Sequence, residues 1–245
     1  MKAADFTAIA ANIAEKYKTL YVMGCFGAPL NAANKQRYKE QYEYNRRPER
    51  AAMIDAASAD TFGFDCICFI KAILWGWNGD TSKIYGGAVY ASNGVPDIGT
   101  NEIIKVCRNV SADFRGIKPG EVVWLDGHIG IYAGNGLAVE SSPAFANRTQ
   151  FTTLGNLSAS PIGGYPVRSW TTHGELPYVD YSAEPAEPPS AGFDLPDAWA
   201  RGAYSRLTAL GIVAGNESGD PMAHKALTRQ EAFVMLDKLY SQLKG

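Results

Sequence analysis

The residues best suited to chemistry lie in the stretch Gly63-Phe64-Asp65-Cys66-Ile67-Cys68, which opens an apolar run that ends at Trp75. The apolar run predicts a buried helix, and Asp65 has the side chain of a helix N-cap. Cys66 then lies in the first helical turn, where unpaired N–H groups and the positive end of the helix dipole favour a thiolate. Because the thiolate is the nucleophilic form of cysteine, we predict that Cys66 is a nucleophile.

A base for this nucleophile comes from residues 127–140, which have the pattern of two strands joined by Gly134-Asn135-Gly136. A three-residue turn places the aliphatic residues of both strands on one buried face. The pairs in this register are Ala133 with Leu137, Ile131 with Val139, and Gly130 with Glu140, and the buried face holds Ile129, Ile131, Leu137 and Val139. A two-residue Asn-Gly turn would divide these four residues between two faces, so we prefer the first register.

The other face of the predicted hairpin carries His128 and Glu140, diagonal to each other across Gly130. Glycine has no side chain that would separate them. With Cys66 they make a set in which cysteine is the nucleophile, imidazole the base, and the carboxylate the acceptor that fixes the imidazole tautomer.

Four segments resemble, in the same order, those of the NlpC/P60 peptidases, papain-like hydrolases of bacterial cell walls. They are Tyr21-Val22-Met23-Gly24-Cys25-Phe26-Gly27, Asp65-Cys66 with its apolar helix, Lys118-Pro119-Gly120-Glu121-Val122-Val123-Trp124, and His128-Ile129-Gly130-Ile131-Tyr132. The resemblance covers residues 1–180 and implies an α+β, papain-like domain in which an antiparallel sheet packs on helices. It also implies that Tyr21 lies beside the nucleophile and shapes the oxyanion or substrate site.

The chain departs from the family pattern at three points. Ile67-Cys68 follows the nucleophile where the family usually has Ser-Gly, and Glu140 stands where the third catalytic residue is commonly His. About 45 residues separate Tyr21 from Cys66, which is longer than the family norm. The resemblance therefore implies a cleft with an unusual wall.

The activity that the resemblance implies is cleavage of an amide bond in peptidoglycan. His128 would take the Cys66 proton, and the Cys66 N–H together with Tyr21 would stabilise the oxyanion. We expect Asp65, Trp124 and Ser141, which flank the motifs, to contact substrate. Endopeptidase cleavage within the peptide stem and amidase cleavage between muramic acid and L-alanine both use this machinery, and both remain open.

The proposed mechanism calls for no metal and no cofactor. Cys68 lies roughly 200° around the helix from Cys66, so the two do not suit a Cys-x-Cys metal site. Four cysteines in a chain of this size do not indicate a disulfide scaffold, and we expect free thiols.

Length and composition limit the function classes. A chain of 245 residues with 46% apolar content is long enough for a full core and a small second module. Its net charge of −2 argues against a dedicated nucleic-acid surface. No apolar run has the length of a membrane span, and residues 1–20 lack the core of a signal peptide. We therefore expect a protein made in the cytoplasm that acts on the bacterial wall, either as a phage or prophage endolysin released through a holin or as an extracellular hydrolase.

Composition divides the chain into residues 1–181, a Pro-rich acidic linker at 182–194, and a helical module at 195–245. In the module we predict one helix with Trp199, Ala203, Leu207 and Leu210 on one face, and a second that opens with the capping box Thr228-Arg229-Gln230-Glu231.

The module resembles one S-layer homology repeat in the segments Gly211-Ile212-Val213-Ala214-Gly215 and Leu227-Thr228-Arg229-Gln230-Glu231-Ala232. That family anchors proteins to anionic secondary wall polymers, which implies that Arg229 meets a carboxylate of the polymer. One repeat of about 50 residues is small for independent stability, so self-association into a homo-oligomer or docking on the catalytic domain is also expected.

Other segments carry weaker signals. The polar stretch 35–47, rich in tyrosines and cations, predicts a solvated helix and loop beside the cleft, with saccharide or anion binding as the alternative. We expect loops at 81–99 and 141–164, a short helix at 101–107, strands at 121–125 and 165–170, and a surface position for His173. Two rival functions remain: a non-catalytic cell-wall-binding protein, and a cysteine transferase or toxin that acts on proteins.

Overall fold

The computed structural model describes residues 1–182, 200, 203–204, 207, 212–213 and 222–244. Contacts divide the chain into two units, Met1–Ala183 and Glu184–Gly245. The first unit combines helices with two β-sheets, which confirms the predicted α+β class. The predicted linker lies, apart from Ser182, outside the described residues.

The larger sheet has seven strands in the order β4-β10-β5-β6-β7-β8-β9, and only β8 and β9 run parallel. The strands are β4 (Arg108–Ser111), β5 (Val122–Leu125), β6 (His128–Gly134), β7 (Leu137–Ser141), β8 (Thr149–Leu154), β9 (Val167–Arg168) and β10 (Thr172–Glu175). The central strand pair, β6 and β7, is the predicted hairpin.

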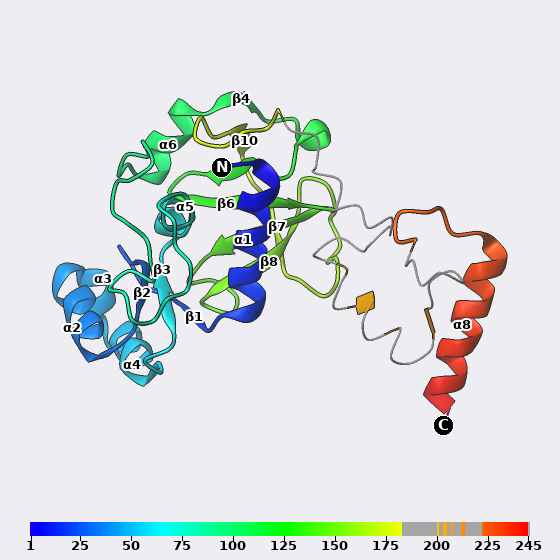
Figure 1. Cartoon of the computed structure of the whole chain (residues 1–245), viewed down its shortest axis with the longest axis horizontal. Helices are drawn as coiled ribbons and strands as arrows, with labels where there is room; N and C mark the ends of the chain where they lie inside the picture. The colour runs from blue at the N-terminus through cyan, green and yellow to red at the C-terminus, as the bar shows by residue number, and fades with distance from the viewer. Residues whose placement is uncertain (183–199, 201–202, 205–206, 208–211, 214–221, 245) are drawn as a thin grey trace. The chain divides into compact units, whose positions relative to one another are not determined.

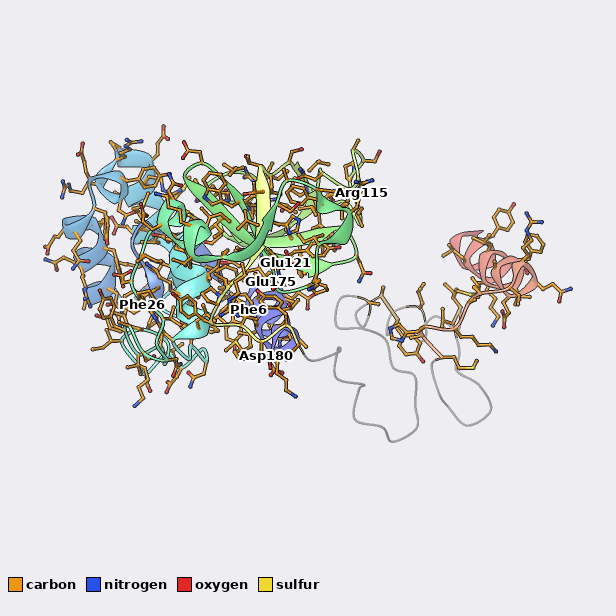
Figure 2. The ribbon with its side chains drawn as sticks, turned by 90° about the horizontal axis from the view of Figure 1, so that it is seen from above. Phe6, Phe26, Arg115, Glu121, Glu175 and Asp180 are labelled. Carbon is orange, nitrogen blue, oxygen red and sulfur yellow. The ribbon has the colours of Figure 1, made fainter. Side chains whose placement is uncertain are left out.

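Two helices, α1 (Ala3–Lys16) and α5 (Cys66–Leu74), pack against this sheet (Figure 1). α1 buries Phe6 (Figure 2), Ala10 and Ile13, which recur at helical spacing and meet the main core. α5 is buried along its whole length, as its apolar sequence predicts. The helix that carries the cysteine is therefore held rigidly against the strands that carry the base and the acid.

A second sheet leads the chain into the cysteine. Its strands β1 (Thr19–Tyr21), β3 (Phe62–Phe64) and β2 (Phe26–Pro29) lie in the order β1-β3-β2, so residues 21–27 are not merely a turn. β1 and β3 are parallel, with Tyr21 opposite Phe64. Because β3 ends two residues before Cys66, this pairing places Tyr21 next to the start of α5.

Between β2 and β3 the chain forms a cluster of helices beside the small sheet (Figure 1). They are α2 (Ala32–Gln41), α3 (Glu43–Arg46) and α4 (Pro48–Ala56). The long spacing noted in the sequence is thus occupied by three helices. A short helix, α6 (Thr100–Val106), confirms the prediction for 101–107, and a 3-10 turn at Phe114–Gly116 precedes β5.

The hairpin keeps the predicted faces but reaches them by a different turn. Ile131 pairs with Val139 as predicted, whereas Leu137 pairs with Gly134 and not with Ala133. The turn has two residues, and the register shifts between Tyr132 and Gly134. Asn135 and Gly136 both have positive φ, which a two-residue hairpin turn requires. The extra residue in β6 restores the alternation that we expected the turn itself to provide.

Three strands of the larger sheet were not predicted. Residues 141–164 contain β8, which is buried at every position, and β4 and β10 pair with each other. β10 also pairs with β5, whereas the predicted last strand at 165–170 is reduced to the two residues of β9. These strands are fixed by long-range pairing, and Thr-rich β8 was mistaken for a polar loop.

His173 is not a surface residue. It lies on β10, is almost fully buried, and its Nδ1 pairs with the buried carboxylate of Glu121. Its Nε2 bonds the carbonyl oxygen of Asp113 at 3.0 Å. The pair holds the start of β5 to β10, a contact between residues far apart in sequence.

In the second unit the main described element is α8 (Arg229–Lys244). The predicted capping box is confirmed: the Thr228 N–H donates to Glu231 Oε2 at 2.8 Å, and the Glu231 N–H donates to Thr228 Oγ1 at 3.2 Å. Arg229 is exposed at the first turn of α8. Of the first predicted helix, Ala203 and Leu207 are helical, while Trp199 and Leu210 lie outside the described residues.

Candidate active site

Asp65 caps α5 as predicted. Its Oδ1 accepts the N–H of Cys68 at 2.7 Å, and its Oδ2 accepts the N–H of Gly24 at 2.7 Å. Cys66 is the first residue of the helix and is only 7% exposed. The first N–H groups of a helix have no intrahelical acceptor, so the start of α5 provides donors beside the Cys66 sulfur.

The ionisation of Cys66 differs from the prediction. Burial, followed by the negative charge of Asp65, raises the pKa of the Cys66 thiol to about 12. The backbone N–H groups of Ile67 and Ile129 favour the thiolate but are outweighed. The resting thiol is therefore protonated at neutral pH, and a base must remove its proton before it becomes a nucleophile.

His128 and Glu140 lie side by side across β6 and β7. His128 Nε2 and Glu140 Oε2 are 2.6 Å apart, and the Glu140 side chain is fully buried. A Cβ at Gly130 would lie 3.3 Å from Glu140 Cβ and 3.1 Å from the Trp170 ring. Glycine at this position thus leaves room for the pair, as the sequence predicts.

Glu140 is held in its ionised form. Burial by itself would raise the pKa of Glu140, but the hydrogen bond and charge of His128 and the charge of Arg168 outweigh it and lower the pKa. Arg168 Nε donates to Glu140 Oε1 at 2.7 Å. Because a carboxylate only accepts, His128 Nε2 carries the hydrogen and Nδ1 keeps the lone pair. The imidazole is therefore oriented to act as a base through Nδ1.

Arg168 and Trp170 complete the arrangement and were missed as site residues. The rings of Trp170 and His128 are stacked, with centroids 5.4 Å apart and planes at 12°. The Arg168 guanidinium lies 5.7 Å from the Trp170 ring centroid. The sequence pattern assigns both residues only to a last strand. Their two-residue spacing places them on one side of that strand, which was the one signal available in the sequence.

Cys66 approaches the strand that begins with His128. The Ile129 N–H lies close enough to the Cys66 sulfur to favour the thiolate. Within the described residues no hydrogen bond joins the sulfur to His128 itself. Catalytic hydrogen bonds are often long in free enzymes and shorten when the substrate binds.

Tyr21 lies beside Cys66. Burial first, and then the proximity of Cys66 and Asp65, raise the pKa of its hydroxyl. Arg50 fixes Tyr21 by donating to its carbonyl oxygen and by lying 5.6 Å from its ring centroid. Arg50 also donates to Asn147 Oδ1 at 2.6 Å, so it joins Tyr21 to the loop between β7 and β8.

The three residues expected to contact substrate have different environments. Both oxygens of Asp65 are occupied by backbone N–H groups. Ser141 is fully buried and its hydroxyl donates to the Phe64 carbonyl at 3.0 Å, which makes it a tie between β7 and β3 and corrects its assignment to substrate. Trp124 is half-buried on β5, and its Nε1 is buried without a hydrogen-bond partner in the described part of the chain.

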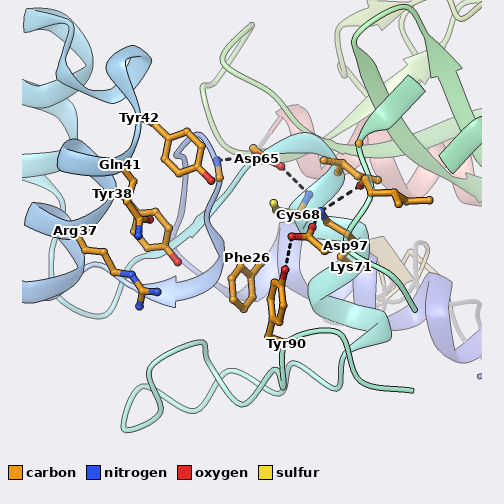
Figure 3. A pocket seen from close by; sticks show the side chains of 14 residues that line it. Phe26, Arg37, Tyr38, Gln41, Tyr42, Asp65, Cys68, Lys71, Tyr90 and Asp97 are labelled. Carbon is orange, nitrogen blue, oxygen red and sulfur yellow. Dashed lines mark hydrogen bonds and ion pairs between the residues drawn. The ribbon is translucent and has the colours of Figure 1, made fainter. Parts of the chain in front are cut away.

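A pocket of about 310 Å³ lies beside Asp65, which forms part of its lining (Figure 3). Its floor includes Asp65, Ile67 and Cys68, so it adjoins the residues that flank the nucleophile. Cys68 faces this pocket, in agreement with its predicted rotation away from Cys66.

The described residues contain no group of three or more His, Cys, Asp or Glu side chains suited to hold a metal ion. No helix among them combines the length and the apolar character that crossing a membrane requires. All four cysteines are free.

Comparison with models of known protein families and with curated protein sequences finds no match for this chain.

Proposed function

We propose that this chain is a cysteine hydrolase that cleaves an amide bond of bacterial peptidoglycan, with the papain-like fold of the NlpC/P60 peptidases. The observation that carries the proposal is the buried Glu140 carboxylate bonded to His128 Nε2, at the end of the strand that Cys66 approaches from the first turn of α5. A buried acid that orients a histidine beside a helix-start cysteine is the constellation of cysteine hydrolases.

The reaction follows from these positions. His128 Nδ1 accepts the proton of the Cys66 thiol as the sulfur attacks the substrate carbonyl, and the Cys66 N–H and Tyr21 stabilise the oxyanion. The tetrahedral intermediate collapses when His128 gives the proton to the leaving amine, which leaves a thioester on Cys66. Water then attacks the thioester with His128 again as base, and the carboxylic acid and the free thiol are released.

The raised pKa of Cys66 supports a concerted role for the base. A thiol with a pKa of about 12 is almost fully protonated at neutral pH, so attack requires proton transfer to His128 in the same step. Substrate that fills the site would also bring the sulfur and the imidazole into contact. The enzyme is thereby protected from alkylation and oxidation while it is free.

We assign the second unit to attachment. The capping box at Thr228 and Glu231 fixes the start of α8, and Arg229 is exposed in its first turn. An exposed arginine at this point suits the carboxylate of an anionic secondary wall polymer. Self-association through this unit is the alternative.

The function is tested by digestion of purified sacculi with the full chain. Wild-type protein should release soluble fragments, Cys66→Ala and His128→Ala should not, and Cys107→Ala should behave as wild type because Cys107 lies outside the site. Mass spectrometry of the fragments separates the two cleavage sites, since only an amidase frees a stem whose new amino terminus is L-alanine. Full lysis by Cys66→Ala would refute the mechanism.

Attachment is tested on the same walls with Cys66→Ala as background, so that no wall is digested. Arg229→Ala should reduce the fraction that sediments with walls, and Arg115→Ala, a surface change in the first unit, should not. Equal sedimentation of both variants would leave self-association as the role of the unit, which sedimentation velocity of the protein alone would detect.

A further inference from the structure

The pocket beside Asp65 is built largely by segments that the catalytic mechanism does not use (Figure 3). One wall comes from α2 and the residue after it, with Arg37, Gln41 and Tyr42. Another comes from the loop that precedes α6, with Tyr90 and Asp97. The volume, about 310 Å³, is at the lower end of small-molecule sites and suits one ring rather than an extended chain.

Two tyrosines present exposed rings on different walls of this pocket (Figure 3). Tyr42 is 36% exposed and Tyr90 is 55% exposed. Tyr42 packs closely on Gly24, where a Cβ would lie only 2.0 Å from its ring, so the glycine admits the ring beside the start of α5. An exposed aromatic face attracts the polarised C–H groups of a ring that lies flat against it.

Hydrogen bonds hold the Tyr90 side of the pocket in place. The Tyr90 hydroxyl donates to Asp97 Oδ2 at 2.8 Å, and the other carboxylate oxygen of Asp97 pairs with the buried Lys71 ammonium of α5. Tyr90 also packs on Trp75, with ring centroids 5.2 Å apart. The wall is therefore organised before any ligand arrives, which reduces the entropy that binding would cost.

The charges around the pocket balance. Two cations, Arg37 and Lys71, face two carboxylates, Asp65 and Asp97. Asp65 is already saturated by two backbone N–H groups, and Arg37 donates to the Tyr85 hydroxyl at 2.7 Å while other guanidinium N–H groups remain. Such a site offers both donors and acceptors without a net field, which suits a neutral ligand with many hydroxyl groups.

We propose that this pocket binds a sugar ring of the glycan strand, with Tyr42 and Tyr90 against its faces and with Asp97, Gln41 and Arg37 at its polar edge. This inference rests on the proposed hydrolase function and refines it. The lining includes Asp65, Ile67 and Cys68 but not Cys66 itself, so the sugar is held beside the start of α5. Of the amide bonds along the peptide stem, the one nearest the glycan joins the lactyl group of muramic acid to L-alanine, and we assign cleavage to that bond.

Two matched substrates test the proposal on the full chain. One is an N-acetylmuramoyl tripeptide, and the other is the same tripeptide with only a lactyl group in place of the muramoyl group, so that both contain the same scissile amide. Tyr42→Ala should lower kcat/KM about tenfold on the first substrate and less than twofold on the second. Tyr42→Phe should retain activity, and so should Tyr165→Ala, a tyrosine of equal exposure outside the pocket.

A second variant distinguishes loss of sugar binding from loss of the packing between Tyr42 and Gly24. Tyr90→Ala leaves the Gly24 contact intact and should show the same preference for loss on the sugar-bearing substrate. An equal loss on both substrates in either variant would overturn the sugar assignment. It would instead assign the pocket to the peptide stem.

Binding without turnover separates this inference from the proposed function. The lactyl amide of N-acetylmuramic acid, which is neutral like the ring in the glycan strand, should give a saturation-transfer NMR signal with the Cys66→Ala chain that Tyr42→Ala abolishes. If the wild-type chain cleaves nothing yet this signal is present, the hydrolase proposal fails and the sugar site stands. Binding of the tripeptide but not of the sugar, or of neither, would overturn the inference.

Discussion

Arg168 donates a hydrogen bond from Nε to Oε1 of Glu140 over 2.7 Å, while the other carboxylate oxygen bonds His128 at 2.6 Å. Each oxygen of the buried Glu140 carboxylate therefore has its own hydrogen-bond partner. Its lowered pKa depends on both partners, because burial alone would favour the neutral acid. A neutral Glu140 could donate a hydrogen bond as well as accept one, so it would no longer require the hydrogen of His128 to be on Nε2. Nδ1 would then not always be free to act as the base.

Replacement of Arg168 by glutamine should therefore raise the pKa of Glu140 and shift the acid limb of the activity profile to higher pH. We expect kcat/KM near neutral pH to fall about tenfold and to fall further on acidification. The measurement is kcat/KM against pH for wild type and Arg168→Gln. Arg115→Gln is the control, because Arg115 lies on the surface and pairs only with Asp113 over the described residues (Figure 2).

Arg168→Gln should also change how the stability of the protein depends on pH. A carboxylate whose pKa is lowered by folding stabilises the protein above its unfolded pKa of about 4.5, and the stabilisation is lost as the pH falls through the lowered value. The free energy of unfolding, measured with denaturant, should therefore fall less in Arg168→Gln than in wild type as the pH is lowered from about 6 to about 3. Identical pH slopes in both proteins would contradict the role of Arg168.

Gly130→Ala tests whether the space between His128 and Glu140 is required. The new Cβ would lie 3.0 Å from the Val139 carbonyl oxygen and 3.1 Å from Trp170, so the Trp170 ring or Glu140 must move. We expect the fold to persist while activity falls about tenfold or more, because small displacements of catalytic groups are costly. Gly116→Ala, where no atom lies within 4 Å of the new Cβ, is the matched control. Full activity with an unshifted His128 NMR signal in Gly130→Ala would show that the glycine is not needed.

The parts of the site that were predictable are local in sequence. Asp65 caps the helix that begins with Cys66. The hydrogen bond that forms the cap joins Asp65 to Cys68, only three residues further along the chain, so it depends on local sequence alone. The pairing of Ile131 with Val139 followed from aliphatic alternation, although a bulge and not the turn accounts for it. A hydrophobic pattern with period two fixes which face a residue takes more firmly than it fixes the turn.

The parts that were missed depend on contacts between distant segments. Arg168 lies 28 residues from Glu140, and nothing near either residue indicates that they meet. The prediction that Cys66 is a thiolate was also wrong. The sequence places Cys66 at a helix start but does not reveal how completely it is buried or how close the charge of Asp65 lies. The β-branched threonines of β8 were a usable strand signal that we read as polarity.

Alkylation of Cys66 should report its protonation. With a pKa raised to about 12, the thiolate fraction at neutral pH is very small, and the rate with iodoacetamide should rise continuously with pH up to about pH 9.5. Asp65→Asn removes the neighbouring negative charge and should increase the rate at any given pH in this range. Peptide mapping by mass spectrometry measures the rate at Cys66 and, as an internal control, at Cys107, whose pKa burial also raises to about 12.

A rate at Cys66 that reaches its plateau by pH 7 would mean that the resting thiolate forms after all. That outcome would restore the expectation drawn from the helix start and would place the charge of His128 closer to the sulfur than the structure indicates. Asp65→Asn also weakens the helix cap, so the rate must be compared under conditions where circular dichroism shows the variant folded.

His173→Ala should destabilise the fold without a specific loss of catalysis. The substitution leaves Oε2 of the buried Glu121 carboxylate without its hydrogen-bond partner, and an unsatisfied buried charged group costs about 3 kcal/mol. Activity per folded molecule should stay near wild type, because His173 bonds Glu121 and Asp113 and no residue of the candidate site. Denaturant unfolding measures the loss, and the double variant His173→Ala/Glu121→Gln should recover part of it because no buried charge is left unpaired. A change below about 0.5 kcal/mol in the single variant would instead be that of a surface histidine.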